Sequence, residues 1–292
     1  MVRRAIQRVT RSQLPDGSFA HSLMKTAGVV CLLADLAPEP STSVLPRAGE
    51  FLFDVLQSQP GYDMASGVQP GALTTPCDLA GFFGPYEARN TPQVLAQGAG
   101  EMNFFREYEP LLGPKSPVRA RRRSSLDRAG PGSCYAWGLI PLCYVIEALC
   151  RGGFHSDSRL GPAVNAFLGA QRPSGGWCRN LGGGVECTIP AIRALGAHPK
   201  LRHGRGAVAA LRYLRATQSG GAGRKAQTRW RGSRLYAALD AAARFDLAIA
   251  REIIVAGLSA AVQHQRRNGT FGTPCPVARV AAVVAACRRL EK

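Results

Sequence analysis

The stretch that decides the fold runs from Ala166 to Trp177 and reads Ala-Phe-Leu-Gly-Ala-Gln-Arg-Pro-Ser-Gly-Gly-Trp. It holds the end of an amphipathic helix, a glutamine, a glycine turn and an aromatic residue, and this order returns elsewhere in the chain. Two further copies, Gln13–Phe19 and Gln265–Phe271, keep the glutamine, the glycine turn and the aromatic residue, and looser copies follow Gln57 and Gln218. A recurring unit of this kind predicts a repeat architecture in which each unit packs on its neighbours.

Each repeat combines a helix with one polar face and a second helix that is apolar on most sides. The polar-faced helices are expected at 2–13, 43–58, 92–108, 158–172, 202–217 and 245–265. The apolar helices are expected at 20–36, 77–88, 134–150, 187–196, 231–243 and 275–290. A helix such as Val280–Cys287, apolar nearly all round, needs protein on every side, and an inner ring provides it. The repeat therefore predicts an all-α protein, a single (α/α)6 toroid over residues 1–292 with six helix pairs and an apolar inner ring.

The composition fits a globular chain in a reducing compartment. Of its 292 residues 46% are hydrophobic, enough to bury a sizeable core. The sequence has no run of about 18 apolar residues, so no membrane span is predicted. The basic N-terminus is not followed directly by the apolar core of a secretory signal peptide. An odd number of cysteines, nine, argues against a disulfide scaffold. We therefore expect a cytoplasmic protein, with peripheral attachment to a membrane as an open alternative.

The net charge of +18 comes from 37 basic and 19 acidic residues, and only five of the basic residues are lysines. Such an excess attracts an anionic membrane surface, a pyrophosphate or nucleic acid. Nucleic acid is the least expected of these, because the arginines are not interleaved with aromatic residues. A solvated outer surface is the alternative explanation. Residues 113–132, rich in proline, serine and arginine, interrupt the repeat and are expected to form a mobile basic insertion, either a linker or an anion clamp.

A family resemblance rests on the same repeat. Ala166–Leu168, Gln171 and Gly176-Trp177 are similar to the Gln-Trp motif of squalene and oxidosqualene cyclases. The chain thus resembles the prenyltransferase and squalene–hopene cyclase superfamily, whose α/α toroids surround an apolar cavity. The resemblance implies a protein that binds or transforms an isoprenoid or other apolar substrate, as a transferase or an isomerase. The Asp-Xaa-Asp-Asp motif of class II cyclases does not occur in the sequence, so the resemblance carries the fold further than the chemistry.

One short motif offers an acid for such chemistry. Val185–Thr188, Val-Glu-Cys-Thr, resembles the Asp-Cys-Thr-Ala motif of oxidosqualene cyclases, with Glu186 in the position of the acid. A buried carboxylic acid with a raised pKa can protonate a substrate. Alternatively, Glu186 is an acidic residue in a first helical turn, stabilised by the helix dipole. Cys187 and Asp78 complete the set of candidate catalytic residues.

Four cysteines fall at the predicted starts of apolar helices: Cys77, Cys134, Cys187 and Cys275. The inner helices of a toroid run parallel, so these thiols should gather at one mouth of the barrel. A helix N-terminus lowers the pKa of a thiol, and several thiols together suit zinc or an iron–sulfur cluster. His21 holds the equivalent position in the first unit and completes the candidate zinc site. Alternatively, the cysteines pack as small hydrophobic residues.

Aromatic residues near the same helix starts are candidates to line the apolar cavity, where ring faces stabilise cations. These candidate substrate-binding residues are Tyr135, Trp137, Phe82, Phe83, Trp177 and Trp230. Three functions stay open: binding or conversion of an isoprenoid, a metal- or thiol-dependent enzyme, and a non-catalytic scaffold with a basic partner-binding surface.

Overall fold

The structure, a computed structural model, describes residues 2–36, 44–57, 139–177, 184–219, 230, 232–271 and 276–291. The described part of the chain is helical, apart from two isolated bridges that join Gln13 to Phe19 and Phe19 to Ser22. This confirms the all-α prediction. The predicted helices 77–88 and 92–108 and the insertion at 113–132 lie outside the described residues. No helix in the described part is long and apolar enough to cross a bilayer.

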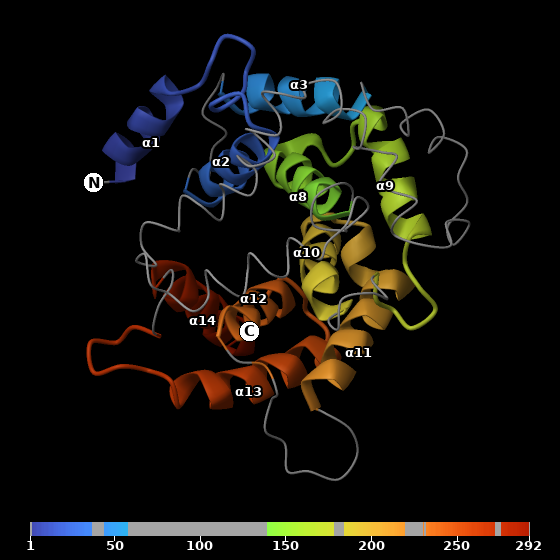
Figure 1. The fold of residues 1–292 in the computed structure, drawn as a ribbon, viewed down its shortest axis with the longest axis vertical. Coiled ribbons are helices and arrows are strands. Elements are labelled where there is room, and N and C mark those ends of the chain that lie inside the picture. The colour runs from blue at the N-terminus through green and yellow to red at the C-terminus, as the bar shows by residue number, and fades with distance from the viewer. Residues whose placement is uncertain are drawn as a thin grey trace, which may run out of the picture. The chain divides into compact units, whose positions relative to one another are not determined.

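Figure 1 shows the described α-helices, which correspond in order to the predicted polar-faced and apolar segments. The polar-faced helices are α1 (Val2–Arg11), α3 (Val44–Gln57), α9 (Gly161–Gly169), α11 (Arg205–Ser219) and α13 (Ala248–Val262). The apolar helices are α2 (Leu23–Leu36), α8 (Leu139–Leu149), α10 (Gly184–Ala197), α12 (Ser233–Ala242) and α14 (Pro276–Leu290). The short helices η3 (Cys150–Phe154), η4 (Ser158–Leu160) and η5 (Leu201–His203) connect some of them. The positions and the order of the helices in these segments therefore follow the sequence pattern.

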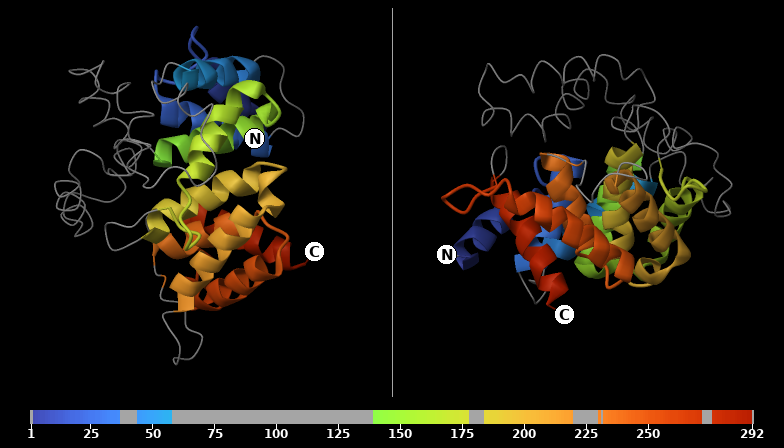
Figure 2. Two further views of the ribbon diagram at one scale, coloured as in Figure 1. Left: turned by 90° about the vertical axis from the view of Figure 1, so that its right-hand side faces the viewer. Right: turned by 90° about the horizontal axis from the view of Figure 1, so that it is seen from below.

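The chain divides into two compact units, Met1–Ala170 and Gln171–Lys292. In the first, α2 packs on α3 and directly on α8. The prediction of six helix pairs placed a further apolar helix, 77–88, between α2 and α8 in the inner ring. Because α2 packs directly on α8, this order of inner helices is not confirmed. In the second unit α10, α12 and α14 form a row of apolar helices, and α11 and α13 lie beside that row (Figures 1 and 2). The single toroid of six pairs stays a prediction.

The glutamine–glycine–aromatic motif forms the same loop three times. We call these loops corner 1 (Gln13–Phe19), corner 2 (Gln171–Trp177) and corner 3 (Gln265–Phe271). In each, the N–H of the residue after the glutamine donates to the carbonyl four residues later, at 2.8 or 2.9 Å. The glycine has a φ of 87°, 90° or 77°, a left-handed conformation that glycine adopts without steric cost. The aromatic residue that ends each corner is buried.

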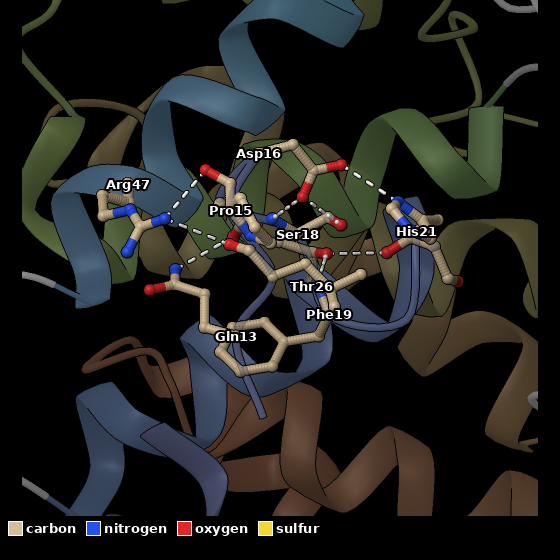
Figure 3. Close-up of polar contacts among 11 residues, drawn as sticks. Gln13, Pro15, Asp16, Ser18, Phe19, His21, Thr26 and Arg47 are labelled. Atoms are coloured by element: carbon tan, nitrogen blue, oxygen red, sulfur yellow. Dashed lines mark hydrogen bonds and ion pairs between the residues drawn. The ribbon is translucent and has the colours of Figure 1, made fainter. Parts of the chain in front are cut away.

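Corner 1 docks the next polar-faced helix, α3. The Gln13 Nε2 group donates to two carbonyls at 2.9 Å, those of Gly17 in the corner and Val44 at the start of α3. The Arg47 guanidinium of α3 donates to two carbonyls of the corner (Figure 3). Gly17 packs so closely on α3 that a Cβ there would collide with the Arg47 carbonyl. The glutamine supplies the bond between corner and helix, and the glycine supplies the room for it.

Corner 2 repeats this docking with α11. Gln171 Nε2 donates to the Gly175 carbonyl at 3.0 Å and to the Gly206 carbonyl of α11 at 2.8 Å. A Cβ on Gly175 would collide with the Ala209 carbonyl, three residues further along α11. Because Gly206 and Ala209 are spaced like Val44 and Arg47, the two corners hold their helices in the same register.

The corners also fix the start of the following apolar helix. The Phe19 N–H donates to the Thr26 hydroxyl in the first turn of α2, at 2.9 Å. The Trp177 N–H donates to the Thr188 hydroxyl of α10 at 3.3 Å. Both threonines are buried. One loop therefore positions two helices.

Corner 3 has the same backbone but no docked helix in the described part of the chain. Its Gln265 Nε2 group lies 3.5 Å from the Gly269 carbonyl, at the limit of a hydrogen bond. A Cβ added to Gly269 would meet no atom within 4 Å. Corner 3 is thus a natural control for the other two.

This comparison predicts unequal costs for one substitution at two positions. Gly269→Ala should lower the free energy of unfolding by about 1–2 kcal/mol, the cost of a left-handed conformation for a residue with a Cβ. Gly175→Ala should cost more, because the Cβ also strikes the Ala209 carbonyl. Urea denaturation of the full chain measures both, and equal losses would show that corner 2 does not hold α11 in this way.

Candidate functional site

Of the predicted site residues, the structure describes the side chains of three: His21, Trp177 and Trp230. For Glu186 and Cys187 the backbone alone is described, and it lies in the first turn of α10. The other predicted site residues lie outside the described part: Cys77, Asp78, Phe82, Phe83, Cys134, Tyr135, Trp137 and Cys275. Trp177 and Trp230 are both buried. Their roles toward a ligand stay predictions.

His21, two residues before α2, is held by an acidic partner in corner 1 (Figure 3). Its Nδ1 atom lies 3.1 Å from Asp16 Oδ2, and the His21 side chain is 67% exposed. When Nδ1 carries the proton and donates it to Asp16, the Nε2 lone pair points away from that bond. A histidine oriented in this way by a carboxylate suits a metal ligand or a general base.

Asp16 is itself fixed by the turn. Its Oδ1 atom accepts hydrogen bonds from the Ser18 N–H at 2.9 Å and from the Ser18 hydroxyl at 2.7 Å. Partial burial raises the pKa of Asp16, but the bonds from Ser18 and His21 outweigh it and hold the pKa below its usual value. Asp16 is therefore a carboxylate at neutral pH, and it orients His21.

The backbone beside this pair is strained. Ala20 has a φ of 56° and His21 a φ of 51°, and within the described residues these are the non-glycine positions with positive φ. Each such residue costs about 1–2 kcal/mol. The Ser22 N–H bond to the Phe19 carbonyl, at 3.2 Å, helps to hold the turn. Strain of this kind gathers where a fold positions a functional group, which makes the His21 turn a candidate site.

A second group of side chains lies where α12 and α14 begin. The rings of Tyr236 and Phe271 have their centroids 5.8 Å apart. The Arg279 guanidinium lies 4.9 Å from the centroid of the Tyr236 ring and donates to the Phe271 carbonyl at 2.7 Å. The sequence interpretation missed both Tyr236 and Arg279. A signal existed, since each is a polar residue early in an apolar helix.

The interior of α8 holds an acid that the sequence interpretation also missed. Glu147 is buried, and its carboxylate lies 3.4 Å from Arg151, which also pairs with Asp35 of α2. Burial raises the pKa of the nearby Cys150 thiol to about 12, with Glu147 adding to the effect, and it raises that of Cys143 well above its usual value. These two thiols are protonated and pack as hydrophobic residues.

Within the described ranges, no three His, Cys, Asp or Glu side chains gather as a metal site. Of the predicted zinc ligands, the side chain of His21 is described, and those of the four cysteines are not. The predicted zinc site therefore stays a prediction.

The Asp16–His21 pair predicts a pH-dependent contribution to stability. Asp16→Asn should keep the turn, because Asn268 occupies the same position in corner 3 and its Oδ1 accepts from the N–H and hydroxyl of Thr270 at 3.1 and 2.7 Å. The substitution removes the charge beside His21. We expect the wild type to have the larger free energy of unfolding at neutral pH.

The sign with pH follows from the lowered pKa of Asp16. The wild-type advantage should be fully present above the unfolded-chain pKa near 3.8 and should disappear as the pH falls through the lower folded pKa. Urea denaturation of both proteins at several pH values measures this, and an advantage that is constant down to acid pH would contradict it.

The comparisons with known proteins bear on the fold. The sequence matches no protein-family model. It also matches no curated protein. A crystal structure of a protein from Actinoplanes is similar over 99% of this chain and 83% of that one, with a TM-score of 0.53 and 18% sequence identity. At that identity the likeness concerns the arrangement of helices and carries no activity with it.

Proposed function

We propose that this chain is an α/α-toroid protein of the terpenoid cyclase and prenyltransferase type, which binds or transforms an isoprenoid or other apolar molecule among its apolar helices. The observation that carries the proposal is the docking corner. The corner occurs in three described copies, of which corners 1 and 2 dock the next polar-faced helix, and it is similar in sequence to the Gln-Trp motif.

Two features support closure of the helix pairs into a ring. Corner 3 has the geometry that docks a polar-faced helix elsewhere in the chain, and a closed ring would give it such a helix. Apolar side chains on the apolar helices at both ends of the chain are exposed, among them Leu32 and Leu36 of α2 and Val284 of α14. An apolar cavity with a bound ligand, or further helices, would cover side chains of this kind.

Glu186 is the candidate acid if the protein converts its ligand. Its backbone lies in the first turn of α10, and Thr188, two residues later, is buried and accepts a hydrogen bond from the Trp177 N–H. In this proposal Glu186 protonates the substrate, while Cys187 and Asp78 are further candidate catalytic residues. The aromatic candidates named above would stabilise the positive charge that protonation creates.

Ligand retention tests the proposal. Full-length protein, purified without detergent, should release an apolar molecule into organic solvent, and added farnesol or squalene should change its tryptophan fluorescence saturably. Absence of both effects would overturn the proposed function.

A matched pair of variants tests the acid. Glu186→Gln should keep ligand binding and lose any conversion of the ligand. Glu252→Gln, at an exposed acid of α13 that lies 3.5 Å from Arg215, should keep both. Product analysis by mass spectrometry separates them, and undiminished conversion by Glu186→Gln would remove Glu186 from the mechanism.

The orientation of His21 favours a second candidate, a metal-dependent enzyme with zinc at the helix starts. His21 would bind the metal through Nε2, and the thiolates predicted at helix starts are the other candidate ligands. This role and the isoprenoid role are distinguishable, because farnesol binding does not require a metal.

Metal content decides this candidate. Protein purified without added zinc should contain about one zinc per chain, and His21→Ala or Cys187→Ser should lower the amount. Cys287→Ser, at an exposed cysteine near the end of α14, is the control and should leave it unchanged. Wild-type protein without zinc would end this alternative.

A further inference from the structure

We propose that Tyr236 and Arg279 form a binding site for a carboxylate group, at the point where α12 and α14 begin. The inference is independent of the proposed apolar ligand, because it rests on these two side chains and their surroundings. Neither residue was among those singled out by the repeat, the cysteines or the family resemblance.

The two residues hold equivalent places on neighbouring helices. Tyr236 is the fourth residue of α12 and Arg279 the fourth of α14, and these two helices pack directly on each other. The guanidinium lies over the tyrosine ring, 4.9 Å from its centroid. Both polar groups therefore belong to one small region at the N-terminal ends of two helices. Helix N-termini carry free N–H groups and partial positive charge.

Arg279 is a buried positive charge without a counter-ion. The residue is 8% exposed, and it forms no ion pair with any residue in the described part of the chain. Its one hydrogen bond donates to a neutral carbonyl, that of Phe271, at 2.7 Å. Neither α12 nor α14 has an acidic residue in its first turn. Burial of an unpaired charge is costly, and the positive ends of two helices add to the cost.

In the described part of the second unit, no acidic side chain pairs with Arg279. Residues 171–292 contain five of them: Glu186, Asp240, Asp246, Glu252 and Glu291. Asp240 lies 3.4 Å from Arg193 and 3.2 Å from Arg244. Asp246 and Glu252 each lie 3.5 Å from an arginine other than Arg279. Arg279 thus has no acidic partner among the described residues, and an anion from outside the chain would supply one.

Tyr236 supplies the second, independent observation. It is 4% exposed, and its hydroxyl has no hydrogen-bond partner among the described residues. Burial raises the pKa of Tyr236 above its usual value, although the charge of Arg279 acts in the opposite direction, so the hydroxyl is a proton donor at neutral pH. A buried donor without an acceptor is rare in folded proteins and calls for an explanation. An anionic oxygen placed beside Arg279 would accept this bond.

Charge balance selects the class of anion. The site offers one positive side chain and one neutral donor, so a carboxylate with one negative charge makes it neutral. A diphosphate would leave several negative charges buried with one arginine. A carboxylate also has two oxygens, and arginine binds such a pair through parallel N–H groups. The rings of Tyr236 and Phe271 suit an apolar body on the ligand.

Thermal unfolding of the full chain with added ligands tests the assignment. Acetate, hexanoate and benzoate are the carboxylate probes, and inorganic phosphate and pyrophosphate are the competing anions. We expect at least one carboxylate to raise Tm saturably, as a ligand that binds only the folded state must. Wild-type protein that no carboxylate stabilises would overturn the proposal, and so would equal or greater stabilisation by phosphate or pyrophosphate.

Tyr236→Phe is the decisive variant, because it removes the hydroxyl and keeps the ring. Without ligand its Tm should equal or exceed that of the wild type, since the lost hydroxyl had no partner. Its carboxylate Kd should rise about tenfold, the usual effect of losing a hydrogen bond to a charged group. An unchanged Kd would show that the tyrosine does not contact the ligand.

Arg279→Met should abolish carboxylate binding, and Arg289→Met is its matched control. Arg289 also donates to a backbone carbonyl, that of Ala243 at 3.0 Å, and lies at the other end of α14. The control should bind carboxylate as the wild type does. Farnesol titration of the same variants keeps the two proposals apart, because Tyr236→Phe should lose carboxylate affinity whether or not the chain binds farnesol.

Discussion

The amide group of one glutamine per repeat is the interaction on which the architecture depends. A glutamine side chain has two N–H donors, and at Gln13 and Gln171 the same Nε2 atom reaches two carbonyls, one in its own loop and one in the next polar-faced helix. Gln218 likewise bonds the Ile253 carbonyl of α13 at 3.1 Å. A shorter side chain would not span this distance, and a carboxylate would have no proton to donate. The glycine, the buried aromatic residue and the threonine of the next helix all help to hold this loop in place.

Ion pairs between neighbouring helices then set the register without adding much stability. Asp35 pairs with Arg151, and Arg159 reaches Glu50 at 2.7 Å while lying 4.0 Å from the centre of the Phe53 ring. Exposed pairs of this kind contribute roughly 0–1 kcal/mol each. Some of the arginines behind the net charge of +18 therefore form ion pairs between neighbouring helices.

The predictable part of the fold was the part encoded locally. The helix positions follow from hydrophobic periodicity and the three corners from a motif within seven residues, so both could be read from the sequence. The contact of α2 with α8 could not, because it joins segments separated by a long stretch of chain. Tyr236 and Arg279 were missed for a related reason. A lone polar residue in an apolar helix gives no sign of whether the folded chain provides it with a partner.

The starts of the apolar helices are where this architecture can change its chemistry without losing its fold. The backbone of the corner aromatic needs one bond to the next helix, but the group that makes this bond varies. The Thr26 and Thr188 hydroxyls accept a hydrogen bond from the N–H of that residue, whereas Arg279 donates a hydrogen bond to its carbonyl. The same structural requirement is thus met by a neutral acceptor in two repeats and by a cation in the third. A repeat that tolerates this exchange can place a charge, a thiol or an acid at one end of its helices, while the glutamine and glycine of the corner continue to hold the helices together.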